Sequence, residues 1–164
     1  MIGPHDETPH DEAMMRRALD LAERAGALGE VPIGAVVYHT DSGDIIAEAA
    51  NRRERDRDPA GHAEFEAIRR ACRALGDWRL NHCSLAVTLE PCSMCAGLIV
   101  NARLGRVVFG AFDPKAGAVR TLHHLLEDPR LNHRCEVVGG VLEQPCGAIL
   151  TEFFRTLRNR HSDA

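Results

Sequence analysis

The chain has 164 residues, of which 24 are acidic and 20 are basic, and 45% of all residues are hydrophobic. This length predicts one domain with an ordinary core, and the formal net charge of −4 excludes a global positive field that would attract nucleic acid. The sequence has no apolar run long enough to span a membrane and no secretory signal at its polar, acidic start, so no membrane partner is expected.

The first part of the chain predicts an arm, a helix and a β-hairpin. Residues 1–8 are expected to form a flexible arm. Thr8 should cap a helix that begins at Pro9, because a capping threonine, a proline and then acidic residues are typical of a helix start. Two mainly apolar segments, 31–39 and 45–50, flank turn residues and predict two antiparallel strands.

The rest of the chain predicts helices that alternate with strands. The charged residues 51–61 are expected to form a solvated loop. Strands are predicted at 84–89, 106–110 and 135–138. Helices are predicted at 62–75, 96–102, 122–126 and 145–160. This order predicts an α/β fold with three α/β/α layers, in which helices flank a mixed five-stranded sheet.

Two short motifs could supply a metal site. His62 and Glu64 open one predicted helix, and Pro91, Cys92 and Cys95 open the next, with Pro91 expected in its first turn. Cys92 and Cys95 are three positions apart and share a helix face, so with His62 they offer three ligands for a catalytic zinc ion. His62 and Glu64 diverge on a regular helix, so both can serve the site only if the metal lies beyond the helix end.

Glu64 is the candidate general acid–base. A zinc ion bound by two thiolates and a neutral imidazole is formally neutral, so it acidifies water less than an all-histidine site would. A nearby carboxylate is then needed to accept the proton and pass it to the substrate. The order H-x-E followed by P-C-x-x-C is typical of zinc-dependent deaminases.

A structural zinc or a redox-active C-x-x-C is the alternative interpretation of the cysteine pair. A structural zinc needs a fourth protein ligand, and the candidates Cys72, Cys83 and His82 form no second paired motif. The four cysteines outside the motif lie in or beside apolar segments and are expected to be reduced, which favours a cytoplasmic protein.

Longer runs of the sequence resemble the bacterial tRNA-specific adenosine deaminase family, within the cytidine deaminase superfamily. The resemblance extends over residues 14–158 and is carried by segments 30–36, 62–64, 88–97, 106–111, 131–134 and 153–155. It implies a cytidine deaminase-like fold over residues 9–160, followed by a tail at 161–164. It also implies a homodimer with one zinc ion per subunit.

The resemblance further implies conversion of adenosine to inosine at the wobble position of a tRNA anticodon. Zinc-bound hydroxide would attack C6 of the base, with Glu64 as the proton shuttle. Asn51 would hydrogen-bond the flipped base, and Val31 and Leu89 would form the walls of its pocket. Neighbouring anticodon nucleotides would contact Asp113, Lys115, Asn132, Phe154 and Arg158.

The chain departs from the family pattern at Gly61, Phe65 and Arg120, none of which is a predicted metal ligand. Because the net charge is negative, RNA binding is expected to depend on local contacts from Lys115, Arg120, Arg155 and Arg158.

Two other functions remain open from the sequence. One is a deaminase of free nucleosides, nucleotides or guanine, which would share all of the metal chemistry. The other is a non-catalytic zinc-binding module, which the presence of Glu64 disfavours. The arginines near the end of the final predicted helix favour a macromolecular substrate over a free nucleoside.

Overall fold

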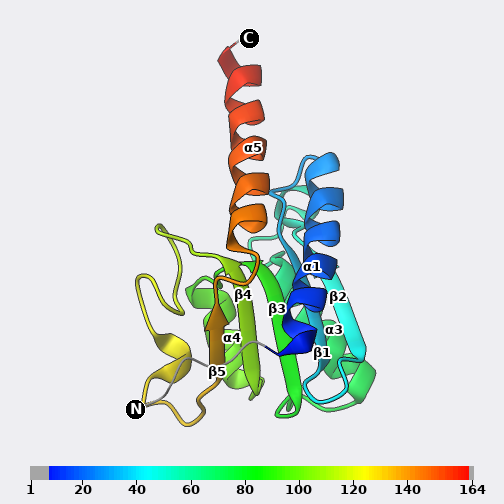
Figure 1. Ribbon diagram of the computed structural model, residues 1–164, viewed down its shortest axis with the longest axis vertical. Coiled ribbons are helices and arrows are strands. Elements are labelled where there is room, and N and C mark those ends of the chain that lie inside the picture. The colour runs from blue at the N-terminus through cyan, green and yellow to red at the C-terminus, as the bar shows by residue number, and fades with distance from the viewer. Residues whose placement is uncertain (1–7, 163–164) are drawn as a thin grey trace.

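The computed structural model describes residues 8–162 and has a five-stranded sheet at its centre (Figure 1). The strands are β1 (Gly34–His39), β2 (Ile45–Ala50), β3 (Cys83–Leu89), β4 (Arg106–Ala111) and β5 (Glu136–Gly139). Their order in the sheet is β2-β1-β3-β4-β5. β1 is antiparallel to both β2 and β3, whereas β3, β4 and β5 are parallel. Four of the five strands therefore run in the same direction, and their carboxyl ends lie at one edge.

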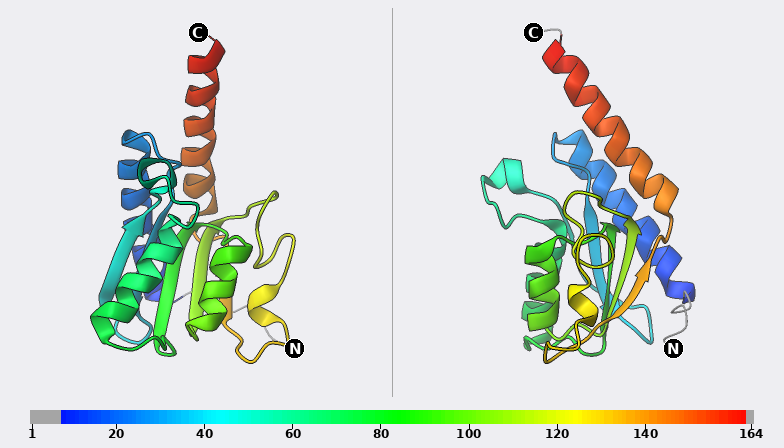
Figure 2. Two further views of the ribbon diagram at one scale, coloured as in Figure 1. Left: turned by 180° about the vertical axis from the view of Figure 1, so that it is seen from behind. Right: turned by 90° about the vertical axis from the view of Figure 1, so that its left-hand side faces the viewer.

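Helices cover both faces of the sheet (Figure 2). They are α1 (Pro9–Ala27), α2 (Arg53–Asp56), α3 (Ala63–Leu75), α4 (Ser93–Asn101) and α5 (Glu143–Ser162), with a 3-10 turn η1 (Leu125–Glu127). α3 and α4 cover one face, and α1 and the first turns of α5 cover the other. This arrangement confirms the predicted three-layer α/β/α fold with a mixed sheet. None of the helices within residues 8–162 combines the length and apolar character needed to cross a membrane.

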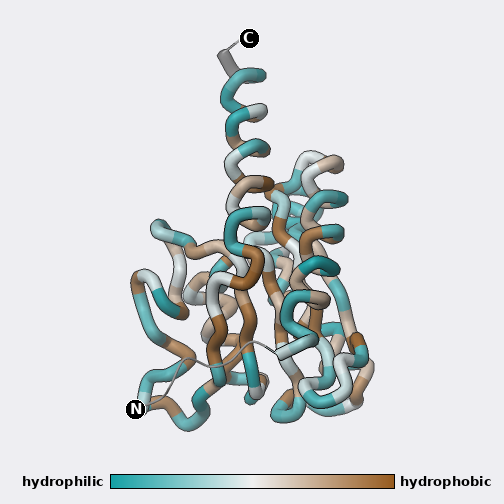
Figure 3. The backbone as a smooth tube through the Cα atoms, viewed as in Figure 1, coloured by the Kyte–Doolittle hydropathy of each residue, from teal (hydrophilic) through white to brown (hydrophobic). Residues whose placement is uncertain are grey.

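The alternation of side chains along each strand divides the core in two. In β1, Ala35 and Val37 pack in the core beneath α3 and α4, whereas Val36 and Tyr38 pack beneath α1. The central strands are correspondingly apolar along their length, and the projecting turns of α5 are mainly hydrophilic (Figure 3). β1, β3 and β4 are therefore buried on both faces, as their continuous apolar runs predict, whereas the edge strand β2 is partly exposed.

Several predicted boundaries differ from the observed ones. β1 begins at Gly34 instead of residue 31, because Pro32 has no N–H to donate to a neighbouring strand. Gly34 is required at this start, since a Cβ there would collide with the backbone of α1. The short helix predicted at 122–126 is only the 3-10 turn η1, and β5 begins one residue later than predicted. The last helix continues past 160 to Ser162.

The loop predicted at 51–61 contains the short helix α2. The carboxylate of Glu30, which is 3% exposed, accepts the backbone amides of Glu54 at 3.3 Å and Arg55 at 2.5 Å. The helix then ends at Arg57, whose φ of 52° is left-handed. A carboxylate from a distant part of the chain thus stabilises the first turn, so the local sequence alone does not predict this helix.

The N-terminus of α1 is attached to the sheet by a buried ion pair. Asp11 is 0% exposed and Arg106, in β4, is 3% exposed. The Arg106 guanidinium donates to both carboxylate oxygens of Asp11, with Nη2 at 2.8 Å from Oδ2, and its Nε donates to Glu136 Oε1 at 3.0 Å. Tyr38 donates its hydroxyl to the same carboxylate at 3.1 Å. This network connects α1, β1, β4 and β5.

Asp11 is expected to contribute strongly to stability. Replacing it with asparagine removes the carboxylate charge that faces the buried guanidinium of Arg106, so the free energy of unfolding at pH 7 should fall by about 3 kcal/mol. The control is Glu48→Gln, because the Arg17–Glu48 pair also connects α1 to the sheet but its side chains are 35% and 25% exposed. That variant should lose less stability in urea unfolding followed by circular dichroism.

The same pair predicts an acid-dependent loss of stability. Burial would raise the pKa of Asp11, but hydrogen bonds from Arg106 and Thr8 outweigh it, so the pKa is lowered. The contribution of Asp11 is therefore complete above its unfolded pKa of about 3.9 and is lost as the pH falls through the lower folded value. The difference in stability between wild type and Asp11→Asn should thus begin to shrink below about pH 4 and should disappear below the folded pKa. A constant difference down to pH 2 would contradict this assignment.

Candidate active site

His62, Cys92 and Cys95 lie beyond the ends of two helices at the carboxyl edge of the sheet. His62 is the residue immediately before α3, and Cys92 is the residue immediately before α4. Both have extended backbones, with ψ of 147° and 174° respectively, so their side chains lie off the helix ends. Pro91 therefore precedes the cap of α4 and does not occupy its first turn as predicted. The cluster therefore lies beyond the start of α3, as expected from the spacing of His62 and Glu64.

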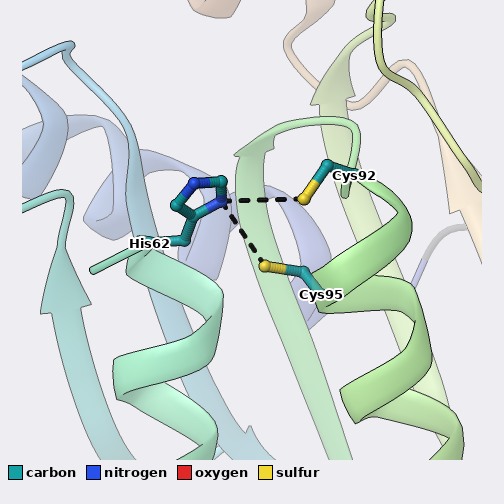
Figure 4. A group of neighbouring side chains, drawn as sticks. All are labelled: His62, Cys92 and Cys95. Atoms are coloured by element: carbon teal, nitrogen blue, oxygen red, sulfur yellow. Dashed lines mark hydrogen bonds between the residues drawn. The ribbon is translucent and has the colours of Figure 1, made fainter. Parts of the chain in front are cut away.

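The three side chains point toward one another (Figure 4). His62 Nδ1 lies 3.7 Å from Cys92 Sγ and 3.6 Å from Cys95 Sγ. All three ligand atoms lie within 4.8 Å of one another, which is close enough for a single metal ion to contact all of them. Since Cys92 and Cys95 are one helical turn apart while His62 is 30 residues before Cys92, the tertiary fold completes the cluster.

The two thiols of the cluster differ in acidity. Hydrogen bonding from Cys95, and then from His62, lowers the pKa of Cys92 to about 3. The hydrogen bond to Cys92, together with burial, raises the pKa of Cys95. Without a metal ion, the two sulfurs therefore share one proton, which a bound cation would displace.

Glu64 lies next to this cluster and is 5% exposed. Burial raises the pKa of its carboxyl group, and the side chain interacts with both His62 and Cys95. A carboxyl group with a raised pKa holds a proton more readily near neutral pH, which suits a group that carries protons during a reaction. Glu64 is adjacent to the position that a metal would take, but it does not belong to the ligand set.

The structure brings three of the predicted pocket residues to the same edge. Asn51, 7% exposed, donates its side-chain amide to the carbonyl oxygen of Val31 at 3.3 Å. The next residue, Arg52, donates its backbone amide to Gly61 at 2.9 Å, which connects this segment to the start of α3. Leu89 ends β3 three residues before Cys92 and is half-buried.

Asp113 and Lys115 lie in the loop of residues 112–121, which crosses the start of α4. Gly117 pairs with Cys92 in an isolated β-bridge, and Ala118 donates its amide to the carbonyl oxygen of Pro91 at 2.9 Å. The tip of the loop, including Lys115, is exposed. This loop is therefore attached directly to a residue of the cluster.

The remaining predicted contacts lie farther away. Phe154, 41% exposed, and Arg158 are on α5, whose last turns project past the carboxyl edge of the sheet (Figure 1). Asn132 lies at the opposite edge, because the neighbouring His133 hydrogen-bonds the carbonyl oxygen of Leu104, just before β4 begins. The structure thus does not bring Asn132 to the cluster.

Two of the arginines predicted to contact RNA form ion pairs within the protein. Arg120 binds Glu127, with Nη2 at 3.1 Å from Oε1, and also donates to the carbonyl oxygen of Val137 at 3.4 Å. Arg155 binds Glu152 at 2.8 Å on the surface of α5. Arg120 is 27% exposed, and its side chain connects the loop to η1 and β5, while its contact with RNA stays a prediction.

Several proteins that are similar to this chain are deaminases. A family model described as MafB19-like deaminase matches residues 9–158. A tRNA-specific adenosine deaminase of Bacillus subtilis is 52% identical over 154 residues, which are 94% of this chain and 94% of that protein. The chain belongs to the tRNA-specific adenosine deaminase family.

Solved structures of relatives agree with this membership. One, from a study of A-to-I editing by tRNA:A34 deaminases at the wobble position of transfer RNA, has a TM-score of 0.79 and is 43% identical, over 84% of this chain and 99% of that chain. Guanine deaminase from Nitrosomonas europaea has a TM-score of 0.77 and is 26% identical, over 90% of this chain and 85% of that chain. The fold is therefore shared with deaminases that act on different substrates.

One residue next to the cluster has a role that the motifs do not show. Glu90 is 2% exposed and immediately precedes the P-C-x-x-C segment. Its carboxylate accepts hydrogen bonds from the loop of residues 112–121. The only signal in the sequence is an acidic residue between an apolar strand and a predicted metal ligand.

The acidity of Cys92 predicts an unusual alkylation profile in metal-free protein. Cys92 should react with iodoacetamide at a rate that is nearly constant between pH 5 and pH 8, because it is already a thiolate. Cys72 is also half-buried, but burial, together with Asp77, raises its pKa, so its rate should rise about tenfold per pH unit. Peptide mass spectrometry at pH 5 should therefore find Cys92 labelled first.

Addition of a thiophilic metal ion should protect Cys92 and leave Cys72 reactive, since Cys92 belongs to the cluster and Cys72 does not. Faster labelling of Cys72 at pH 5, or parallel pH profiles for the two thiols, would contradict the assignment.

Proposed function

We propose that this protein hydrolytically deaminates adenosine to inosine at the wobble position of a tRNA anticodon. The observation that carries the proposal is a buried glutamate beside a His-Cys-Cys cluster, in a chain that is 52% identical to a tRNA-specific adenosine deaminase over nearly its whole length. The fold alone does not decide the substrate, because a guanine deaminase shares it.

Zinc is the metal proposed for the cluster. Two thiolates and one imidazole suit zinc. Bond lengths of about 2.3 Å to sulfur and 2.0–2.1 Å to nitrogen in a tetrahedral site predict nitrogen–sulfur separations of about 3.6 Å. The observed separations are 3.7 and 3.6 Å. The ligand atoms thus already have zinc-like spacing, and three protein ligands leave a fourth position for water.

When bound, zinc acidifies a water molecule and so supplies the nucleophile for attack at C6 of adenine. Glu64 would accept one proton from that water and deliver it to the ring nitrogen, and it would then carry the second proton, from the hydroxyl added at C6, to the amine, which leaves as ammonia. The burial of Glu64 supports this role, since it raises the pKa of the carboxyl group and so makes the carboxylate a stronger proton acceptor.

The base must leave the stack to reach this site, and an anticodon loop is already partly splayed, which lowers the cost. We propose that Asn51 hydrogen-bonds the flipped base between the side chains of Val31 and Leu89. Asp113 and Lys115 in the adjacent loop, and Phe154 and Arg158 on α5, would contact the neighbouring nucleotides.

We also propose that the protein is a cytoplasmic homodimer with one zinc ion per subunit. The position of Asn132 supports this proposal, because it lies at the edge of the sheet opposite the cluster and a second subunit could bring it to the RNA surface. A symmetric dimer would satisfy that requirement with one interface.

The substrate proposal predicts inosine formation in an anticodon stem-loop that carries a wobble adenosine, with free adenosine nearly inert. The assay compares the stem-loop with free adenosine, cytidine and guanine at equal concentration, by chromatography of the products. A stem-loop with guanosine at the wobble position is the matched control. Turnover of a free base or nucleoside at the rate of the stem-loop would instead favour a metabolic deaminase.

The proton-shuttle role predicts that Glu64→Gln keeps its zinc and loses about 10²- to 10⁴-fold in single-turnover rate. Glu66→Gln on the same helix is the control, because Glu66 is paired with Arg69 at 3.0 Å outside the cluster. Cys92→Ala should lose zinc, measured by elemental analysis. A zinc-free Glu64→Gln protein would show that Glu64 has a different role.

A further inference from the structure

Glu90 accepts more hydrogen bonds than any other side chain near the site in the described part of the chain. Its Oε1 accepts the backbone amides of Val119 at 3.2 Å, Arg120 at 2.6 Å and Thr121 at 2.9 Å. Its Oε2 accepts the amide of Asp113 at 3.0 Å and the hydroxyl of Thr121. Both terminal atoms of this side chain must therefore accept hydrogen bonds. An ionised carboxylate has two acceptor oxygens, whereas an amide has only one.

These donors come from both ends of one loop. Asp113 is at the beginning of the 112–121 segment, and the other three donor residues are at its end. A single carboxylate therefore closes the base of the loop. A Cβ on Gly117, within the loop, would collide with the same carboxylate, so the backbone passes directly against it.

The closed loop lies against the metal cluster. Gly117 pairs with Cys92, and Ala118 donates to Pro91, so the loop is held on the two residues that follow Glu90. Asp113 Oδ1 accepts the amides of Lys115 at 2.9 Å and Ala116 at 3.2 Å, which shapes the exposed tip. Glu90 itself is 2% exposed, so it reaches a substrate only through this loop.

We propose that Glu90 is a positioning residue that holds the exposed tip of the 112–121 loop beside the metal site, where the tip binds a nucleotide next to the target base. The inference rests on the proposed function for its RNA substrate. Glu90 increases the affinity for RNA because it fixes the position of Lys115. It does not take part in the chemical step, which is assigned to Glu64 and the metal.

The test substitution is Glu90→Gln, which places an NH2 group against backbone amides on one side. The Kd for the anticodon stem-loop, measured by fluorescence anisotropy, should rise at least about tenfold. The single-turnover rate at saturating RNA should change less than the Kd, and zinc content should stay at the wild-type value. Zinc loss with an unchanged Kd would overturn the inference, because Glu90 would then serve the metal ligands.

A double-mutant cycle with Lys115→Ala separates positioning from general damage. If Glu90 acts through the tip, Lys115→Ala should weaken binding in the wild-type background and have little further effect in Glu90→Gln. Additive effects would overturn the inference. Amide hydrogen exchange should accelerate at residue 113 and residues 119–121 and stay unchanged in α1; acceleration throughout the chain would also overturn it.

Thr121 offers a milder test if Glu90→Gln does not fold. Thr121→Val removes one donor to Glu90 and nearly preserves the shape of the side chain, so the Kd should rise about threefold or more, and Thr121→Ser should restore it. Equal Kd values for all three proteins would overturn the inference. If wild type neither binds nor deaminates the stem-loop, the proposed function fails. If wild type is active and the variants bind the stem-loop as tightly as wild type does, only this inference fails.

Discussion

The site depends on β2 and β3 running in the same direction on either side of β1. Because β1 is antiparallel to both, the two strands end at one edge, and each leads into a segment that precedes a helix. His62 and Cys92 occupy the two positions immediately before those helices, with extended backbones. A cluster at helix ends can then combine a histidine and two cysteines that no single element could present together.

The buried carboxyl groups at this edge differ in their pKa values and in their structural roles, because they accept hydrogen bonds from different donors. Glu30 accepts amides of α2, and Glu90 accepts amides of the 112–121 loop. Burial would raise the pKa of Glu90, but Thr121 and the loop amides lower it, so it stays charged and holds the backbone. Burial raises the pKa of Glu64 instead, so this group can exchange protons. Similar burial thus accompanies a lowered pKa in one carboxyl group and a raised pKa in the other.

The charge distribution requires local RNA recognition. The net charge is −4, and Arg106, Arg120 and Arg155 form ion pairs with acidic side chains of the same chain. Affinity for RNA must therefore come from the shape and position of a few segments near the site. The loop held by Glu90 and the projecting turns of α5 are among the segments that reach past the carboxyl edge (Figure 1).

The sequence by itself determined the chemistry of this protein, and only the tertiary structure decided its geometry. The residue types, the one-turn spacing of Cys92 and Cys95 and the alternation of apolar strands with helices are local properties, so the His-Cys-Cys cluster and the three-layer fold were predictable. The separation of Asn132 from the cluster, the ion pair of Arg120 and the role of Glu90 were not. Each depends on residues 7 to 31 positions apart meeting in space, or on the edge of the sheet at which a loop emerges. Local patterns carry no information about those distances, because they are set by strand order and direction.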